Sequence, residues 1–216
     1  MCTRYFTAMI KELAPLIEAA ISSRLTEQIR TRLGKDTSFL GEIRPSDVAA
    51  VIAPDRNGER GVFPMVWGFS VNGLAAPVVN ARVETAAEKP SFRDSWLNRR
   101  CIIPAVSFYE WQHYRTSDGK MKTGEKYSIK PVDSAVTYIA GLYRYEEKEG
   151  FRYPVFTVLT TEPTEKMREL HDRMPLILPE SAINDWIRPG GDPFWVTKLA
   201  LTDLLIERTD DQQTFF

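Results

Sequence analysis

The sequence predicts an α+β fold in a single domain, and three observations support this prediction. Segments rich in β-branched and aromatic residues, which favour strands, occupy most of the middle of the chain. Helical periodicity is confined to the two ends and to short crossovers between the strand segments. No linker or internal repeat divides the 216 residues, so one domain is expected over 1–216, with a loose tail from about residue 209.

The N-terminal region predicts helix. Apolar residues recur at steps of three and four between residues 10 and 33, which is the pattern of an amphipathic helix. Pro15 interrupts or restarts this helix, and Gly34 is a typical stop signal. One long kinked helix and two shorter helices fit this pattern equally well.

Strands and turns follow. Apolar segments flank Asn57-Gly58, the strongest short signal of a hairpin turn. A polar loop over 116–125, which contains Asp118-Gly119, is expected to separate two later strands. The remaining expected strands cover 77–82, 101–111, 126–130, 135–145 and 151–161, and the remaining helices cover 91–99, 163–170 and 179–187.

Composition excludes several classes of protein. Two cysteines and two histidines, without ligand spacing, argue against a disulfide framework and a zinc site, so no metal is expected. The sequence contains no phosphate loop, dinucleotide fingerprint or nucleophile elbow, and no cofactor is expected. No apolar run is long enough to span a membrane and no secretory signal is present, so a cytoplasmic protein is expected.

Net charge is −1, so any site for an anion must be local. The segment 89–100 carries four basic residues against Asp94, with Phe92 and Trp96 between them. Such a mixture can bind single-stranded nucleic acid, although a solvated helix packed through its aromatic residues is commoner. Asn80, Arg82 and Glu84 are expected on one side of a strand, either as its solvated face or as a polar binding stripe.

Three side chains are candidates for acid–base chemistry. Glu110 follows an apolar strand segment and shares a face with Phe108. It is therefore either turned to solvent or buried with a raised pKa, which suits a general acid or base. His171 follows a predicted helix and either points into a cleft or hydrogen-bonds its own loop. His113 borders the polar loop and is expected to be exposed.

Cys2 stands directly behind the initiator methionine. Removal of Met1 is usual when the second side chain is small, and it gives Cys2 a free α-amine beside its thiol. This amine titrates near pH 8, about two units below lysine, so it can attack an aldehyde to form a Schiff base. The thiol can then close on the imine carbon as a thiazolidine ring. The same residue also suits amide hydrolysis, and the structural alternative is a small apolar anchor for the first strand.

The motifs MC-x-R-Y, WGF, NARVET, RCIIPAVSFYEW and LTTEPTEKMRELHDRMPLIL resemble those of the SOS response-associated peptidase (SRAP) family of abasic-site processing proteins. The resemblance extends from residue 1 to about residue 187. It implies strand-rich mixed sheets in a barrel-like core with peripheral helices. It also implies a monomer that binds abasic sites in single-stranded DNA, and hence association with the nucleoid when DNA is bound.

The resemblance assigns roles to particular residues. Cys2 would form a covalent thiazolidine DNA–protein crosslink, and Asn80 would hold the N-terminal residue and the sugar. Glu110 would transfer protons at the amine and imine through lyase-like Schiff-base chemistry, and His171 would assist sugar opening and reversal. The family name reflects peptidase-like self-removal of Met1. The expected contacts to DNA come from Arg4, Arg82, Thr160 and Arg173.

Two other functions stay open on the sequence. An N-terminal-cysteine peptidase or amidohydrolase would turn over small amides and ignore DNA. A non-catalytic module that binds single-stranded DNA would keep its affinity after Cys2→Ala.

Overall fold

The computed structural model describes residues 2–37, 39–116 and 118–209. Five strands form a closed barrel, because each pairs with the next in the order β10-β4-β3-β6-β9 and β9 pairs again with β10. All contacts in this ring are antiparallel except the parallel pair β10–β4. The five strands are β3 (Val48–Pro54), β4 (Arg60–Trp67), β6 (Arg100–Ala105), β9 (Thr137–Lys148) and β10 (Phe151–Thr161). The barrel-like core expected from the resemblance is confirmed.

Short strands extend the barrel, and a second sheet lies beside it. β5 and β11 add to β10, and β12 adds to β9. The second sheet has the order β13-β8-β7-β1-β2. The short strands are β5 (Asn80–Arg82), β11 (Met174–Pro175) and β12 (Ile177–Leu178). The second sheet contains β1 (Arg4–Thr7), β2 (Gly41–Ile43), β7 (Ser107–Arg115), β8 (Met121–Pro131) and β13 (Leu204–Arg208).

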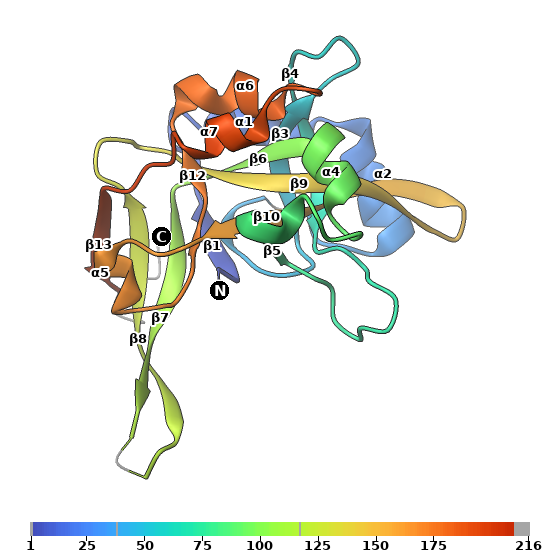
Figure 1. Ribbon diagram of the computed structural model, residues 1–216. Helices are drawn as coiled ribbons and strands as arrows, with labels where there is room; N and C mark the ends of the chain where they lie inside the picture. Colours follow the sequence, from blue (N-terminus) through green and yellow to red (C-terminus); the bar gives the residue numbers. More distant parts are fainter. Residues whose placement is uncertain (1, 38, 117, 210–216) are drawn as a thin grey trace.

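The helices are short and lie around the strands (Figure 1). They are α1 (Ala14–Ile21), α2 (Arg24–Leu33), α3 (Val83–Ala86), α4 (Arg93–Asn98), α5 (Glu165–Arg168), η1 (Glu180–Ala182), α6 (Ile183–Ile187) and α7 (Pro193–Thr197). Within the described ranges, none of these helices has the length and apolar character needed to cross a membrane.

Both faces of the central strands are buried. Along β3, alternate residues enter two different apolar clusters, one shared with the helices and one shared with the second sheet. Val48, Ala50 and Ile52 belong to the first cluster. Ala49, Val51 and Ala53 belong to the second. A strand covered on both faces is a continuous apolar run, which explains why 47–53 shows no alternation.

Several local predictions are confirmed. The N-terminal region is helical as expected, and of the two arrangements that fitted the pattern it forms two helices. Gly34 ends the second with φ of 65°, a left-handed conformation that glycine adopts without strain. The β3–β4 hairpin turns at Asn57-Gly58, as expected. The predicted loose tail lies mostly outside the described residues.

Other predictions are wrong. The segment 121–125 is not loop, because β8 begins at Met121 and pairs with β7 out to Arg115. The segment 101–111 is not one strand, because β6 and β7 divide it between the two sheets. Asn80, Arg82 and Glu84 do not share a strand, since β5 ends at Arg82 and Glu84 lies on α3.

Arg100, one of the four basic residues in segment 89–100, is buried, whereas Lys89 and Arg93 are exposed. Arg100 is 1% exposed, and its guanidinium donates to Trp186 O at 2.6 Å and to Trp96 O at 2.7 Å. It also donates to the carbonyl oxygens of Leu97 and Arg188. These carbonyls lie at the C-terminal ends of α4 and α6, where helices leave acceptors unsatisfied and favour a positive charge. Arg100 therefore joins two helix ends and has no surface for DNA.

We predict that Arg100→Met lowers the free energy of unfolding by about 3 kcal/mol or more, because several buried carbonyls lose a charged donor. Chemical denaturation measures this loss. Arg93→Met on the exposed side of α4 is the matched control and should stay within about 0.5 kcal/mol of the parent protein. Equal stabilities of the two variants would contradict the role of Arg100.

Candidate functional site

The site is built around the second residue of the chain. Cys2 is 0% exposed and lies two residues before the start of β1, which pairs with β2 on one side and β7 on the other. The register places Arg4 opposite Tyr109, so Glu110 lies alongside the residues that precede β1. Burial raises the pKa of the Cys2 thiol, and the negative charge of nearby Glu110 raises it further. The thiol is therefore held protonated.

Asn80 holds Cys2 in place. Its side-chain Nδ2 donates a hydrogen bond to the Cys2 carbonyl oxygen at 2.9 Å. Asn80 owes this position to β5, whose parallel pairing places it opposite Val158 of β10. The Asn80 Oδ1 atom is buried and accepts no hydrogen bond from the described residues. The predicted contact between Asn80 and the N-terminal residue is thus present, with one acceptor left over.

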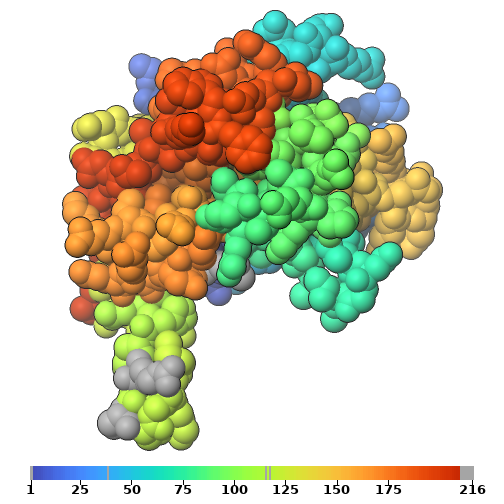
Figure 2. Space-filling model, in the orientation of Figure 1, coloured from blue at the N-terminus to red at the C-terminus, as the bar shows by residue number. Residues whose placement is uncertain are grey.

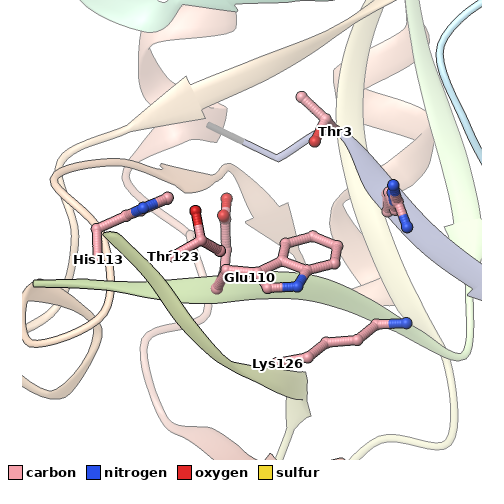
Figure 3. Close-up of a pocket in the computed structure, with 7 residues that line it drawn as sticks. Thr3, Glu110, His113, Thr123 and Lys126 are labelled. Carbon is pink, nitrogen blue, oxygen red and sulfur yellow. The ribbon is translucent and has the colours of Figure 1, made fainter. Parts of the chain in front are cut away.

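Glu110 is buried, which was one of its two predicted states. The residue is 3% exposed, and burial raises its pKa to about 7, with the negative charge of Asp172 adding to the effect. A carboxyl group with this pKa exchanges its proton near neutral pH, as a general acid or base must. It lines a cavity of about 490 Å³, and Figure 3 shows its side chain directed toward the N-terminal segment at Thr3.

His171 lies just beyond α5, at the junction predicted from the sequence. The backbone N–H of Arg173 donates to its Nδ1 at 3.1 Å, which fits a neutral ring. Asp172 also approaches Nδ1 at 2.7 Å, which fits a protonated ring. Burial lowers the pKa of His171 and outweighs the pull of Asp172, whose side chain is 80% exposed and screened by water. We therefore assign the neutral ring, with Nδ1 as acceptor.

His113 is the residue that sequence reasoning missed. It is exposed as predicted, yet its ring packs edge-on against the ring of His171 at 5.8 Å between centroids, and it lines the same cavity as Glu110. Regular alternation places residues three apart on opposite faces of a strand. A register shift between Trp111 and His113 interrupts the β7–β8 ladder here, and such irregularities redirect side chains. The sequence around Trp111 and His113 contains no local pattern that predicts this register shift.

The predicted DNA-contacting residues divide into two groups. Arg82 is exposed where β5 meets α3, and the Arg4 side chain is 37% exposed, paired with Glu42 and stacked over Trp111. Thr160 is 0% exposed and its hydroxyl donates to Ala81 O at 3.4 Å.

Arg173 belongs with Thr160 in the buried group. It is 8% exposed and its guanidinium donates to both Glu84 oxygens and to Thr160 O. A phosphate contact from Arg173 stays a prediction that requires the pair with Glu84 to open. No group of three or more potential metal ligands occurs among the described residues.

The arrangement brings together a thiol, a carboxyl group with a raised pKa and two imidazoles, and Glu110 and His113 line its cavity. Asn80 binds the carbonyl oxygen of Cys2, and the buried carboxyl group of Glu110 lies near enough to raise the pKa of the Cys2 thiol. His113 lines the cavity beside Glu110, and the ring of His171 packs against the ring of His113. Such a set of groups suits nucleophilic attack accompanied by proton transfers.

We predict that Glu110→Gln removes a pH dependence of stability. The native pKa of about 7 lies above the unfolded value of about 4.3, so this group stabilises the fold fully below about pH 4. That stability is lost as the pH rises through 7, by an amount on the order of 3 kcal/mol. Urea unfolding should show the variant gaining stability relative to wild type between about pH 5 and pH 8. A constant difference would show that Glu110 titrates normally.

We predict that His113→Gln raises the pKa of His171, because the charge of protonated His113 opposes protonation of its neighbour. Titration of the imidazole resonances by NMR measures the change. Gln112→Ala, one residue away on β7, is the control and should leave the titration of His171 unchanged. A lower pKa of His171 in His113→Gln would contradict the contact.

The chain is similar in sequence to several proteins named abasic site processing proteins. The protein YoqW of Bacillus subtilis, named an abasic site processing protein, is 41% identical over 164 residues, which cover 73% of this chain and 70% of YoqW. YoaM of the same organism, with the same description, is 36% identical over 162 residues, covering 69% of this chain and 68% of YoaM. The similarly named HMCES of Rattus norvegicus is 26% identical over 165 residues, covering 62% of this chain and 47% of HMCES.

Solved structures share the fold. A crystal structure of a protein from Bacteroides thetaiotaomicron has a TM-score of 0.73 at 19% identity, covering 97% of this chain and 93% of the other. A protein from Bordetella bronchiseptica has a TM-score of 0.69 at 22% identity, covering 97% and 100%. The profile described as SOS response associated peptidase (SRAP) matches residues 1–213. This chain belongs to the SRAP family.

Proposed function

We propose that this protein binds abasic sites in single-stranded DNA and joins to them covalently through Cys2 once Met1 has been removed. The observation that carries the proposal is the hydrogen bond from Asn80 to the Cys2 carbonyl, beside the buried carboxyl group of Glu110. A fold gains nothing structural from a proton-exchanging carboxyl group next to its second residue. The names of the relatives, abasic site processing proteins, support the same substrate.

The chemistry follows from the groups present. The α-amine of Cys2 attacks the aldehyde carbon of the ring-opened deoxyribose, and the resulting carbinolamine loses water to give an imine. The thiol sulfur then adds to the imine carbon, and its proton passes to the nitrogen as the thiazolidine ring closes. One water molecule is released in total. Glu110 relays these protons: it protonates the departing hydroxyl and regains a proton from the nitrogen, then accepts the thiol proton and passes it to the nitrogen. Burial raises the pKa of this carboxyl group, which suits it to both giving and accepting a proton near neutral pH.

Two further groups have assigned parts in this proposal. The neutral imidazole of His171 accepts and returns the proton needed to open the sugar ring and to reverse the adduct. Arg4 and Arg82 are the exposed cations for flanking phosphates, and these contacts give salt-dependent affinity without sequence preference. An abasic nucleotide has no base to unstack, so its sugar reaches the cavity at a lower cost than that of an intact nucleotide.

A peptidase is the second candidate, because the family description contains that word. In this alternative Cys2 attacks an amide carbonyl with its own amine as the base. Removal of Met1 by the protein itself would be the simplest such reaction. This alternative predicts turnover of small amides and no dependence on DNA.

We predict a covalent adduct between the protein that starts at Cys2 and a single-stranded oligonucleotide with one abasic site, detected by intact mass. Cys2→Ala should abolish it. Cys101→Ala removes the other buried free thiol and should leave it unchanged. Glu110→Gln should slow its formation by about a hundredfold or more with DNA affinity retained.

Loss of the adduct in Cys101→Ala would show that its assignment to the Cys2 thiol is wrong. A protein that has lost Met1 and forms no adduct would overturn the proposal, and amide turnover by that protein would favour the peptidase.

A further inference from the structure

The β7–β8 hairpin projects well beyond the body of the molecule. Figure 1 shows the two strands continuing away from the barrel, and Figure 2 shows a narrow arm joined to the body at its base. The ladder continues to the pair Arg115↔Met121, and a turn closes it with a hydrogen bond from Thr116 N to Lys120 O. A two-stranded hairpin that packs against nothing else is only marginally stable. The projecting part of this hairpin therefore adds little to the stability of the fold and is a candidate for a binding role.

The arm begins at the candidate site. Glu110, His113 and Thr123 line the cavity from the base of the hairpin, and the strands run outward from there. Four residues separate Glu110 from Tyr114, which is about 13 Å along a strand. His113 and Thr123 face the cavity as direct partners, and the next pair, Tyr114 and Lys122, lies on the opposite face of the hairpin. A DNA strand that leaves the cavity on this side therefore reaches that pair, within a few nucleotides of the lesion, by crossing the edge of the narrow arm.

Tyr114 and Lys122 are direct cross-strand partners on the arm. Tyr114 is 46% exposed, and its ring lies against Gly124, where an added Cβ would stand 3.1 Å from Tyr114 Cε1. The missing side chain at Gly124 lets the ring rest on the backbone, an arrangement known to stabilise glycine positions in sheets. The result is an aromatic surface that is held in place on one side and open on the other.

Lys122 is positioned for an anion. It is exposed and forms no ion pair with any acidic side chain that the structure describes. Lys120 and Lys126, by contrast, are paired with Asp118 and Glu42. The segment 112–126 contains four basic and two acidic residues, a net charge of +2 on a chain whose net charge is −1.

We propose that Tyr114 and Lys122 form a binding site for the single strand that flanks the lesion, with a base stacked on Tyr114 and a phosphate on Lys122. Alternating aromatic and cationic groups bind single strands in this way, because every base has a face for stacking. The inference rests on the proposed function, since the lesion in the cavity determines where the flanking strand passes.

The test measures non-covalent affinity for a single-stranded oligonucleotide carrying tetrahydrofuran, an abasic analogue without an aldehyde, with about ten nucleotides on each side. Tyr114→Ala combined with Lys122→Ala should weaken binding about tenfold. Lys122→Ala alone should reduce the slope of log K against log salt by about 0.7, the loss of one phosphate contact. Tyr114→Phe, which keeps the ring for stacking, should bind with the wild-type affinity.

The β9–β10 hairpin provides the matched control. Tyr145, which is 48% exposed, and the exposed Lys148 lie on that hairpin. Figure 1 shows the β9–β10 hairpin projecting in a different direction from the β7–β8 hairpin, from another side of the molecule. Tyr145→Ala combined with Lys148→Ala should leave the affinity unchanged. Equal losses in the two double variants, or no loss in either, would overturn the proposal.

A second experiment distinguishes this binding site from the crosslinking chemistry. The double variant Tyr114→Ala and Lys122→Ala should form the covalent adduct at the wild-type rate on a short oligonucleotide with a single nucleotide on each side of the abasic site. A slower reaction on that short substrate would place the two residues in the chemical step and contradict the assignment. If wild type forms no adduct at all, the proposed function fails, while the affinity measurement still decides the role of the arm.

Discussion

The pairing of β9 with β10 is the constraint on which the rest of the structure depends, because it closes the barrel. β10 also holds β4 and β5 in parallel and β11 in antiparallel pairing, so it positions Asn80 and supports the segment that follows His171. Close approach at Gly141 makes this closure possible. An added Cβ there would lie 2.6 Å from Ile103 Cδ1 and 2.8 Å from Thr157 O. Any side chain would force these strands apart.

The second sheet and Asn80 hold the segment that begins at Cys2 in place. Terminal residues normally fray, because few contacts hold them. Here β1 is paired on both edges and the Cys2 carbonyl is bound by Asn80, so Cys2 is fully buried. The entropy of ordering this terminus is lost on folding and need not be lost again when a substrate binds. Pre-organisation of this kind is what a nucleophile at a chain end requires.

The site also carries groups that weaken the fold. A buried carboxyl group with a pKa of about 7 is unfavourable at neutral pH, and the buried Oδ1 of Asn80 accepts no hydrogen bond from the described residues. Arg100, by contrast, satisfies several carbonyls at the ends of α4 and α6. The polar groups that stabilise the protein and those that serve the proposed chemistry therefore lie in different parts of the molecule and can be altered separately.

The sequence by itself determined the features that depend on neighbouring residues. These include the helical character of the N-terminal region, the stop at Gly34 and the turn at Asn57-Gly58, whereas the sequence left open whether Glu110 is buried or turned to solvent. Only the tertiary structure decided which strands pair, because pairing joins residues far apart in the chain. It divided 101–111 between two sheets, extended β8 through a polar segment, buried Arg100 and brought His113 against His171. Local patterns indicate what a residue prefers, and the closed barrel determines which partner it meets.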